Sequence, residues 1–534
     1  MILKICMDHP HHGIVQLLTL ANGSNVGNDR TTGDFLANFA EGKSIAARSL
    51  IDQLKHSGSE LAALISSTET LCDSYVTLAM AKTDKWHGSS KPKDIGLAQV
   101  IGKGKVSLDR CLGRGNWGQG GGIALPAVLT KPPKVQKDCD YRMLIGSDLI
   151  VGFESTFRIT QTGLHRPKIV NCIGETGRRY KQLVKGEDDI RQDSVIQLVF
   201  STVNRLLGGS GALKITTYSV VPLSPTSGVL EWVLNTEPFG DFLVDSRSGG
   251  SSGISAHSKY FPGAWGNNLC RSHLRFAPVN GKLAAFQEIC KRFPPAFRFF
   301  FQERFGHSVS AWFAARQNYT RSCAASSMVG HILGIGDRHT HNILISNKTG
   351  GVVHIDFGIV FEQGKVLTTP ETIPFRLTRD IVDGMGVCGV EGLFSKSCSD
   401  VLRVLRENNS TLLTVLDVIT NDPLYKFLVS PVQKRKAQAR DGADDDEEGD
   451  GIHRQDEGEG MDGQGTAEEE EEEEEEDSND AASRALTKIG NKLRGFEENT
   501  PEQLSIEGQV QLLINEARSE DNLSRLYFGW APWL

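Results

Sequence analysis

One stretch, GIGDRHTHNILISNKTGGVVHIDFG from Gly334 to Gly358, constrains the fold more than any other part of the chain. It holds two short apolar runs, ILI and VVHI, which are separated by the turn-forming cluster NKTGG. Short β-branched runs on either side of a glycine-containing loop are typical of a β-hairpin. A turn centred on Thr349 would place Asn342 directly opposite Asp356, with Cβ atoms about 5 Å apart.

The open end of this predicted hairpin carries the oxygen atoms that a hard metal ion prefers. An amide oxygen from Asn342 and a carboxylate from Asp356 would suit Mg²⁺, which also takes water and substrate phosphates. Asp337 stands five residues before Asn342. Kinase catalytic loops have the same offset, with the aspartate accepting the substrate hydroxyl proton and the asparagine holding metal. Asp356-Phe357-Gly358 then reads as the metal-binding Asp-Phe-Gly motif.

A plainer interpretation is a buried hairpin whose ends are capped by polar residues. One aspartate alone would favour that interpretation. Three oxygen-bearing residues at kinase offsets favour phosphoryl transfer, with Asp337 as the catalytic base and Asn342 and Asp356 as the metal ligands.

Several motifs depart from ordinary protein kinases in the same direction. Ordinary kinases read His-Arg-Asp, whereas Asp337-Arg338-His339 places the aspartate first, and no Ala-Pro-Glu follows Asp356. The segment KGEDDIRQD, the N-terminal KICMDHPHH and the aromatic ending NLSRLYFGWAPWL add to the pattern. Together they resemble the phosphatidylinositol-3-kinase-related protein kinases, the PIKK family. The segment after Gly358 is most similar to the member that signals DNA double-strand breaks.

The resemblance implies an ATP site built from the preceding strands, and Mg²⁺ as its metal, with Mn²⁺ as the alternative. Residues 150–159 are predicted as two short strands around a turn that covers the phosphates. A hairpin is predicted around the GETG of 174–177 and a strand at 214–222, and the stretches 87–122 and 246–280 are predicted as loops. His339 would donate to the transferred phosphate, and Arg338 would have a structural role. The nucleotide residues implied are Ser155 and Thr156 as phosphate donors, Lys185 on the phosphates with Asp188 as its partner, Asp193 at the inner edge of the adenine pocket, and Glu231, Trp232 and Val233 as the hinge.

Two of these assignments keep a structural alternative. A lysine beside the acidic start of a helix is common on protein surfaces, so Lys185 could be a surface residue. Trp232 is as consistent with a core position as with an adenine wall.

The expected fold class is α+β: a bilobal PI3/PI4-kinase-like protein kinase fold with a β-rich N-lobe and a helical C-lobe. A helical FAT remnant would precede it and a FATC helix would close it. The chain would then be a fragment of a longer protein. The predicted parts are the end of FAT (1–90), a linker and N-lobe start (91–145), the N-lobe (146–233), the C-lobe (234–425), an acidic disordered linker (426–502) and FATC (503–534).

Composition adds limits rather than a function. The formal net charge of −8 is explained by the strongly acidic residues 441–480, which include nine successive glutamates, Glu468 to Glu476. Such a block repels itself and stays disordered. Ten scattered cysteines without a Cys-x-x-Cys pair indicate a reducing compartment. No apolar run reaches the length of a transmembrane helix. A small basic cluster, KRK at 434–436, weakly favours the nucleus.

Three other functions fit the sequence less well than a protein kinase. A phosphoinositide lipid kinase shares the inverted loop, but a phosphorylated headgroup calls for clustered basic residues. Residues 359–380 lack such a cluster, so a protein substrate is favoured. A non-catalytic scaffold should have lost the oxygen ligands, and the acidic linker argues against direct nucleic-acid binding. The resemblance implies substrates with Ser or Thr before Gln, recruitment by DNA-break sensor complexes, and a homodimer in the full-length protein.

Overall fold

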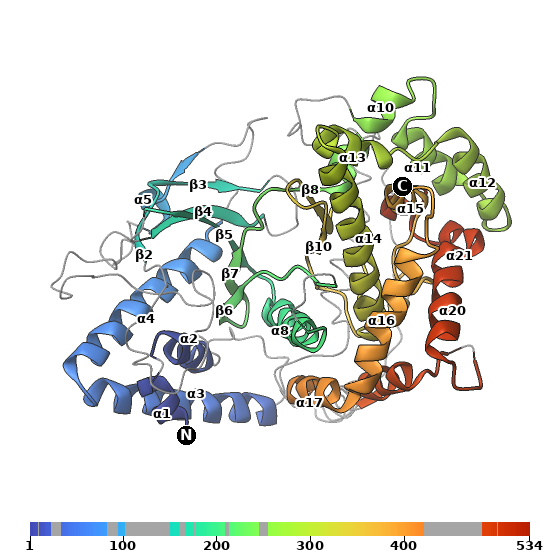
Figure 1. The fold of residues 1–534 in the computed structure, drawn as a ribbon. Helices are drawn as coiled ribbons and strands as arrows, with labels where there is room; N and C mark the ends of the chain where they lie inside the picture. The colour runs from blue at the N-terminus through green and yellow to red at the C-terminus, as the bar shows by residue number, and fades with distance from the viewer. Residues whose placement is uncertain are drawn as a thin grey trace, which may run out of the picture. The chain divides into compact units, whose positions relative to one another are not determined.

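The computed structural model describes eleven parts of the chain: residues 1–8, 10–22, 34–82, 94–101, 150–160, 166–174, 177–208, 213–244, 255–420, 483–498 and 500–534. They form two compact units (Figure 1). The first unit holds residues 1–197 and 218–234, and the second holds residues 198–217 and 235–534. The expected α+β class is confirmed.

The first unit begins with helices, as predicted for the first ninety residues. They are α1 (Ile2–Asp8), α2 (Pro10–Ala21), α3 (Asp34–His56) and α4 (Ser59–Ala79). Helix α4 packs on the sheet of this unit through buried polar contacts as well as apolar ones. The Tyr75 hydroxyl donates to Gln182 Oε1 (2.6 Å), and Lys168 Nζ donates to the Ala79 carbonyl (2.6 Å).

The sheet of the first unit is antiparallel, with strand order β1-β3-β4-β5-β7-β6. Strands β4 and β5 form the hairpin predicted around GETG. The strands are β1 (Ile95–Gly96), β2 (Ile150–Phe153), β3 (Thr156–Ile159), β4 (Lys168–Gly174), β5 (Arg179–Gly186), β6 (Val220–Ser224) and β7 (Ser227–Glu231).

The two short strands predicted within residues 150–159 are present as β2 and β3, but the chain between them makes only a bend at Ser155 and does not reverse direction. Strands β2 and β3 both pair with β4, on the edge that β5 leaves open, so they continue each other. Glu154 keeps the ladder intact between them, because its N–H donates to the Asn171 carbonyl (3.0 Å). Ser155 therefore lies at an irregularity between two consecutive strands that share the partner β4.

Two other expectations for this unit also need correction. Residues 87–122 were predicted as loop, yet their described part contains β1 and α5 (Ala98–Ile101). The strand predicted for residues 214–222 is β6, which begins only at Val220 because the chain from 213 to 219 runs without regular structure.

The second unit combines a small sheet with helices. Strands β8 (Thr236–Pro238), β9 (Ile343–Ser346) and β10 (Val352–His354) pair in the order β10-β9-β8. The helices are α9 (Phe239–Leu243), α10 (Ala256–Tyr260), α11 (Asn267–Phe276), α12 (Lys282–Arg292), α13 (Arg298–Phe305), α14 (Val309–Ile332), α15 (Arg379–Met385), α16 (Leu393–Glu407), α17 (Asn409–Thr420), α20 (Ile506–Arg518) and α21 (Glu520–Ser524), with short 3-10 turns η2 (Val279–Gly281), η3 (Gln363–Val366) and η4 (Phe528–Trp530). Helix α8 (Arg191–Leu206) passes from the first unit into the second.

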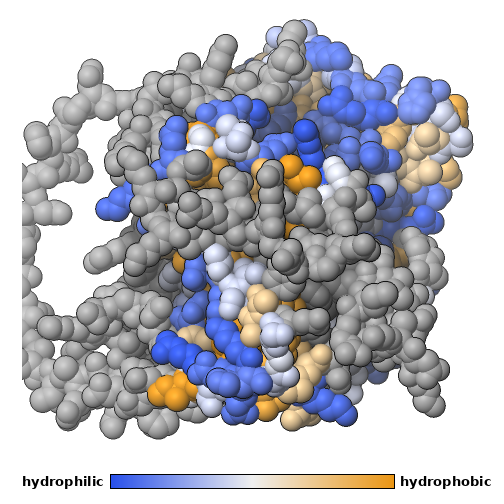
Figure 2. Space-filling model, turned by 90° about the vertical axis from the view of Figure 1, so that its left-hand side faces the viewer, coloured by the Kyte–Doolittle hydropathy of each residue, from blue (hydrophilic) through white to orange (hydrophobic). Residues whose placement is uncertain are grey.

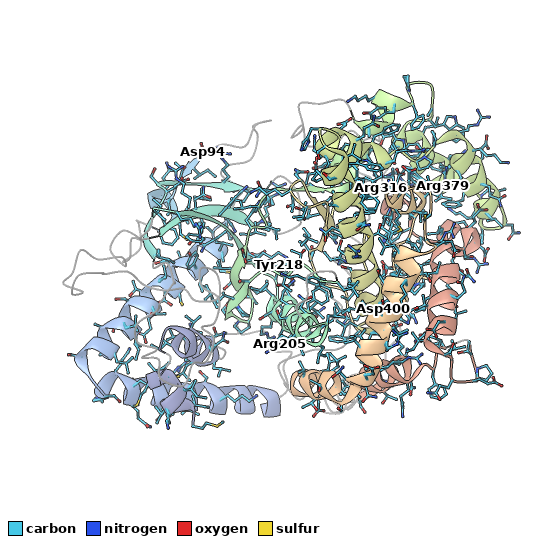
Figure 3. The ribbon with its side chains drawn as sticks, viewed as in Figure 1. Asp94, Arg205, Tyr218, Arg316, Arg379 and Asp400 are labelled. Atoms are coloured by element: carbon cyan, nitrogen blue, oxygen red, sulfur yellow. The ribbon has the colours of Figure 1, made fainter. Side chains whose placement is uncertain are left out.

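Helix α14 is the central element of the second unit. Its last turns are buried and rich in small residues, which lets neighbouring elements approach closely. Phe297, Phe300 and Phe301 form an aromatic cluster near it, with ring centroids 5.2–5.7 Å apart. Arg316 on α14, labelled in Figure 3, donates to the Met385 carbonyl at the end of α15 (3.0 Å). The loop that carries Asp337 begins shortly after the buried end of α14.

Two segments predicted without structure are helical. The loop expected for residues 246–280 contains α10 and α11, because Ser255 caps the first and Cys270 and Leu274 give the second a buried face. The disorder expected for residues 426–502 is wrong for 483–498, where residues 483–494 are helical. The acidic block itself lies outside the described residues.

Length and apolar character decide whether any of the described helices could span a membrane. On the face drawn in Figure 2, the described residues are mostly hydrophilic and the apolar ones form small separate patches. Among the described helices, none is both long and apolar enough to cross a bilayer.

Candidate active site

The predicted hairpin is present, but its register differs by one residue. Val352 pairs with Ile345 and His354 with Ile343, and the Ile355 N–H donates to the Asn342 carbonyl (3.0 Å). Asn342 therefore faces Ile355 and not Asp356. The reason is the loop: the Ser346 N–H donates to the Gly351 carbonyl (2.9 Å), so the loop inside this closure is 347–350 and its centre falls between 348 and 349.

Asn342 is fixed by its own neighbours. Its side chain is buried, and its amide nitrogen donates to the Asp337 carbonyl (2.9 Å). Its main-chain N–H donates to the His339 carbonyl (3.0 Å), which closes the loop into a tight turn. Because the nitrogen of the amide is engaged, the amide oxygen is the atom that suits a metal ion.

The two aspartates of the site share an unusual backbone conformation. Asp337 has φ 52° and Asp356 has φ 60°, both in the left-handed region. A residue with a side chain pays about 1–2 kcal/mol for this conformation, so contacts from the surroundings must hold it. Such backbones are concentrated at functional sites.

Arg338 supplies part of that support, in line with the structural role predicted for it. Its buried guanidinium donates to the carbonyls of Gly336 (2.8 Å), Ile355 (2.7 Å) and Asp356. One side chain thus connects the loop that carries Asp337 to the residues that follow β10.

His339 is held with one ring nitrogen as an acceptor. Its Nδ1 accepts from the His341 N–H (3.1 Å), so in the neutral ring Nε2 carries the proton. Burial lowers the pKa of His339, although Asp337 opposes the shift. The neutral form is favoured at neutral pH, and its Nε2–H remains able to donate.

Glu371 lies at this site but is not among the residues predicted from the sequence. In the sequence it is only one of several acidic residues in 359–380, a segment that contains both acidic and basic side chains. Its carboxylate accepts from the Asp337 N–H (2.8 Å) and so supports the left-handed residue. Burial, with a further contribution from Asp337, raises the pKa of Glu371 to about 7. Gly336 and Gly364 allow this approach, because a Cβ at either position would lie 2.8 Å from the carboxylate.

The first unit brings together one predicted pair. Lys185 lies near the end of β5, and its Nζ is 3.6 Å from Oδ2 of Asp188. Asp193 is buried in the first turn of α8. Ser155 is exposed between β2 and β3, and its carbonyl accepts from the Leu97 N–H (2.8 Å). Thr156 is the first residue of β3 and is half-buried.

The predicted hinge follows β7. Glu231 is the last residue of this strand, and the Trp232 N–H still donates to the Lys181 carbonyl (3.1 Å) before the chain leaves the sheet through Val233. Trp232 is half-buried, so the core alternative is not supported. Lys181 Nζ lies 3.6 Å from the centroid of the Trp232 ring and occupies one face of it.

The residues present fit a magnesium ion bound with substrate phosphates. Among the residues that the structure describes, no group of three or more His, Cys, Asp or Glu side chains forms a metal cluster. The ligands would be the oxygens of Asn342 and Asp356, and Mg²⁺ is often held by one or two protein ligands plus phosphates and water.

The fold and these sites define the class of protein. Residues 179–429 match the family Phosphatidylinositol 3- and 4-kinase, and residues 503–534 match the FATC domain. The chain belongs to the phosphatidylinositol-3-kinase-related protein kinases, as the motifs indicated.

Within this family the chain is similar to the ATM and Tel1 kinases. It is 38% identical to the serine/threonine-protein kinase ATM of Arabidopsis thaliana and 37% to the serine-protein kinase ATM of Sus scrofa, over its whole length in both cases. It covers only 13% and 17% of those proteins. The open conformation of CtTel1 has a TM-score of 0.76 at 32% identity, with all of this chain and 17% of that chain covered.

Proposed function

We propose that this chain is the catalytic part of an ATP-dependent serine/threonine protein kinase. The observation that carries the proposal is the loop and hairpin in which Asp337, Asn342 and Asp356 are held by buried contacts. The names of the similar curated proteins support the same activity. Because the chain spans less than a fifth of those proteins, the activity of the whole protein stays a proposal.

The residues would divide the work as follows. Asp337 orients the substrate hydroxyl and accepts its proton, a role worth roughly 10²–10⁴-fold in rate. Asn342 and Asp356 hold Mg²⁺, which when bound neutralises charge on the phosphates of ATP. His339 donates a hydrogen bond from Nε2 to the transferred phosphoryl group. Lys185 binds the phosphates, and Glu231, Trp232 and Val233 bind the adenine.

The basic residues of segment 359–380 favour a protein substrate over a phosphoinositide. Lys365 is engaged by Glu362 and by Glu498 (2.8 Å). Arg376 is buried, and Arg379, labelled in Figure 3, donates to the Phe293 carbonyl (3.0 Å). All three cations therefore have internal partners, and this segment offers no basic cluster for a phosphorylated headgroup.

The finer assignments follow from the similarity to ATM and Tel1. We propose phosphorylation of Ser or Thr before Gln, roles in the DNA double-strand-break checkpoint and telomere maintenance, and a nuclear location. DNA-break sensor complexes would recruit the protein. A homodimer in the full-length protein is supported by the Tel1 structure described as a complete dimer with C2 symmetry.

A transfer assay tests the proposal. The chain is given ATP with Mg²⁺ or Mn²⁺ and a peptide library that varies the residue after Ser or Thr, with phosphatidylinositol in a parallel reaction. We expect phosphopeptide enriched in Gln at that position. Phosphorylation of the lipid alone would favour the lipid kinase. Absence of transfer to both, by protein that binds ATP, would contradict the enzyme assignment.

A further inference from the structure

We infer that Arg376 is a positioning residue that ties the last residues of the chain to the catalytic loop. The inference deepens the proposed function, since it concerns the geometry of the loop that carries Asp337. The terminal segment is defined here as residues 530–534.

Arg376 makes contacts of two kinds. Its guanidinium donates to the carbonyls of Trp530 (2.8 Å), Ala531 (2.8 Å) and Leu534 (3.0 Å), and it lies 3.9 Å from the centroid of the Trp530 ring. It also donates to the carbonyl of Arg338 in the catalytic loop (3.3 Å). One buried side chain therefore joins the terminal segment to the residue that follows Asp337.

Arg338 extends the connection to the second aspartate. While its carbonyl accepts from Arg376, its own guanidinium donates to main-chain oxygens on both sides of the site, at Gly336 and Asp356. Hydrogen bonds of the two buried arginines therefore connect the terminal segment to the backbone that carries Asp337 and Asp356, the two aspartates in the left-handed conformation. We call this connection the arginine relay. Those conformations persist only when their surroundings hold them.

The chemistry of arginine matters at this position. A planar guanidinium with five donors can reach several carbonyls at once, whereas a lysine ammonium acts as a compact point charge. Burial lowers the pKa of Arg376 to about 9, against the opposing effect of Asp380 and Glu371. The carbonyl oxygens around it supply much of the polar environment that the buried cation needs.

A plainer interpretation is that Arg376 only fastens the terminal segment to the body of the unit. Arg406 offers a matched control. It also holds the C-terminal part of the chain, by donating to the Leu504 carbonyl (3.1 Å) and to Gln509, but among the described residues none of its hydrogen bonds reaches the loop that carries Asp337. Both arginines fasten the same region, and only Arg376 touches the loop.

The test compares Arg376→Lys with Arg406→Lys in the 534-residue chain, using steady-state transfer from ATP to a Ser-Gln peptide. We expect Arg376→Lys to lower kcat on the order of 10²-fold with little change in KM for ATP, because small misplacement of catalytic groups has effects of that size. Arg406→Lys should keep kcat within about twofold at equal folded fraction. Equal kcat values for the two variants would contradict the proposed positioning role of Arg376.

Amide hydrogen exchange separates this inference from the proposed function. The N–H groups of Gly336, Asn342 and Ile355 form main-chain hydrogen bonds in the loop and hairpin. We expect them to exchange faster in Arg376→Lys than in Arg406→Lys, and unchanged exchange would refute the relay. If the parent chain transfers no phosphate, the proposed function is contradicted. The exchange rates still test whether Arg376 positions the loop, because they do not depend on activity. Should Arg376→Lys not fold, Trp530→Leu serves instead, since it removes the ring beneath the guanidinium and leaves the carbonyl.

Discussion

The side-chain amide of Asn342 donates to the main-chain carbonyl of Asp337 across 2.9 Å. The proposed metal ligand thus also fixes the proposed catalytic base, so the two roles are coupled in one residue. Asn342→Asp separates them: it keeps an oxygen for the metal but places a carboxylate against the Asp337 carbonyl. We expect kcat to fall on the order of 10²-fold. Kinetics over a Mg²⁺ titration would measure this, and a variant with parental kcat would show that the contact is dispensable.

Asp337 itself is the most direct test of the mechanism. Asp337→Asn should lower the rate of transfer by roughly 10²–10⁴-fold, because the amide cannot accept the hydroxyl proton. Nucleotide affinity, measured by titration, should stay near the parental value. Asp400→Asn is the control, since Asp400 pairs with Lys396 and Arg403 on α16, where Figure 3 labels it. Parental turnover in Asp337→Asn would remove it from the mechanism.

Lys185 gives a prediction for the nucleotide. Lys185→Met should raise KM for ATP by about 10- to 100-fold, the range for loss of a hydrogen bond to a charged group. Lys259→Met is the control, because Lys259 forms an exposed ion pair with Glu303 (2.8 Å). If both variants keep the parental KM, Lys185 is an ordinary surface lysine.

Glu371 predicts a pH dependence of stability. Its pKa is raised from 4.5 to about 7, so its protonated form is the one that the folded state favours. Its contribution to the free energy of unfolding is complete below about pH 4.5 and is lost as pH rises through 7. Glu371→Gln should flatten the decline of the melting temperature between those values. An identical slope in the variant would mean that Glu371 titrates normally.

Glu362 predicts the opposite behaviour in acid. Although burial opposes the shift, Lys492 and Lys365 hold the pKa of Glu362 at about 2. Its contribution is present above pH 4.5 and is lost as pH falls toward 2. Glu362→Gln should destabilise the chain by roughly 3–5 kcal/mol at neutral pH, because Lys492 is buried and would lose its partner. Denaturant unfolding measures this, and an unchanged midpoint would show that Lys492 finds another partner.

The corrections have a common physical origin. The hairpin strands were predictable because β-branched runs around a glycine-rich turn have few alternatives. The register was not, since it depends on where the loop closes, here between Ser346 and Gly351. Helix α11 was not predicted for a similar reason. Cys270 and Leu274 form its buried face only because other elements of the fold cover them.

The sequence by itself determined the chemistry available to this protein. Asp337, Asn342 and Asp356 lie on one loop and hairpin. Their spacing in the sequence indicated this, because residues close in sequence on a short hairpin are also close in space. Only the tertiary structure decided which distant groups hold them. Glu371 reaches the Asp337 N–H from 34 residues away, and Arg376 joins Arg338 to a segment more than 150 residues further on. Such contacts depend on how buried elements pack, and an isolated glutamate or arginine carries no local pattern that would reveal them.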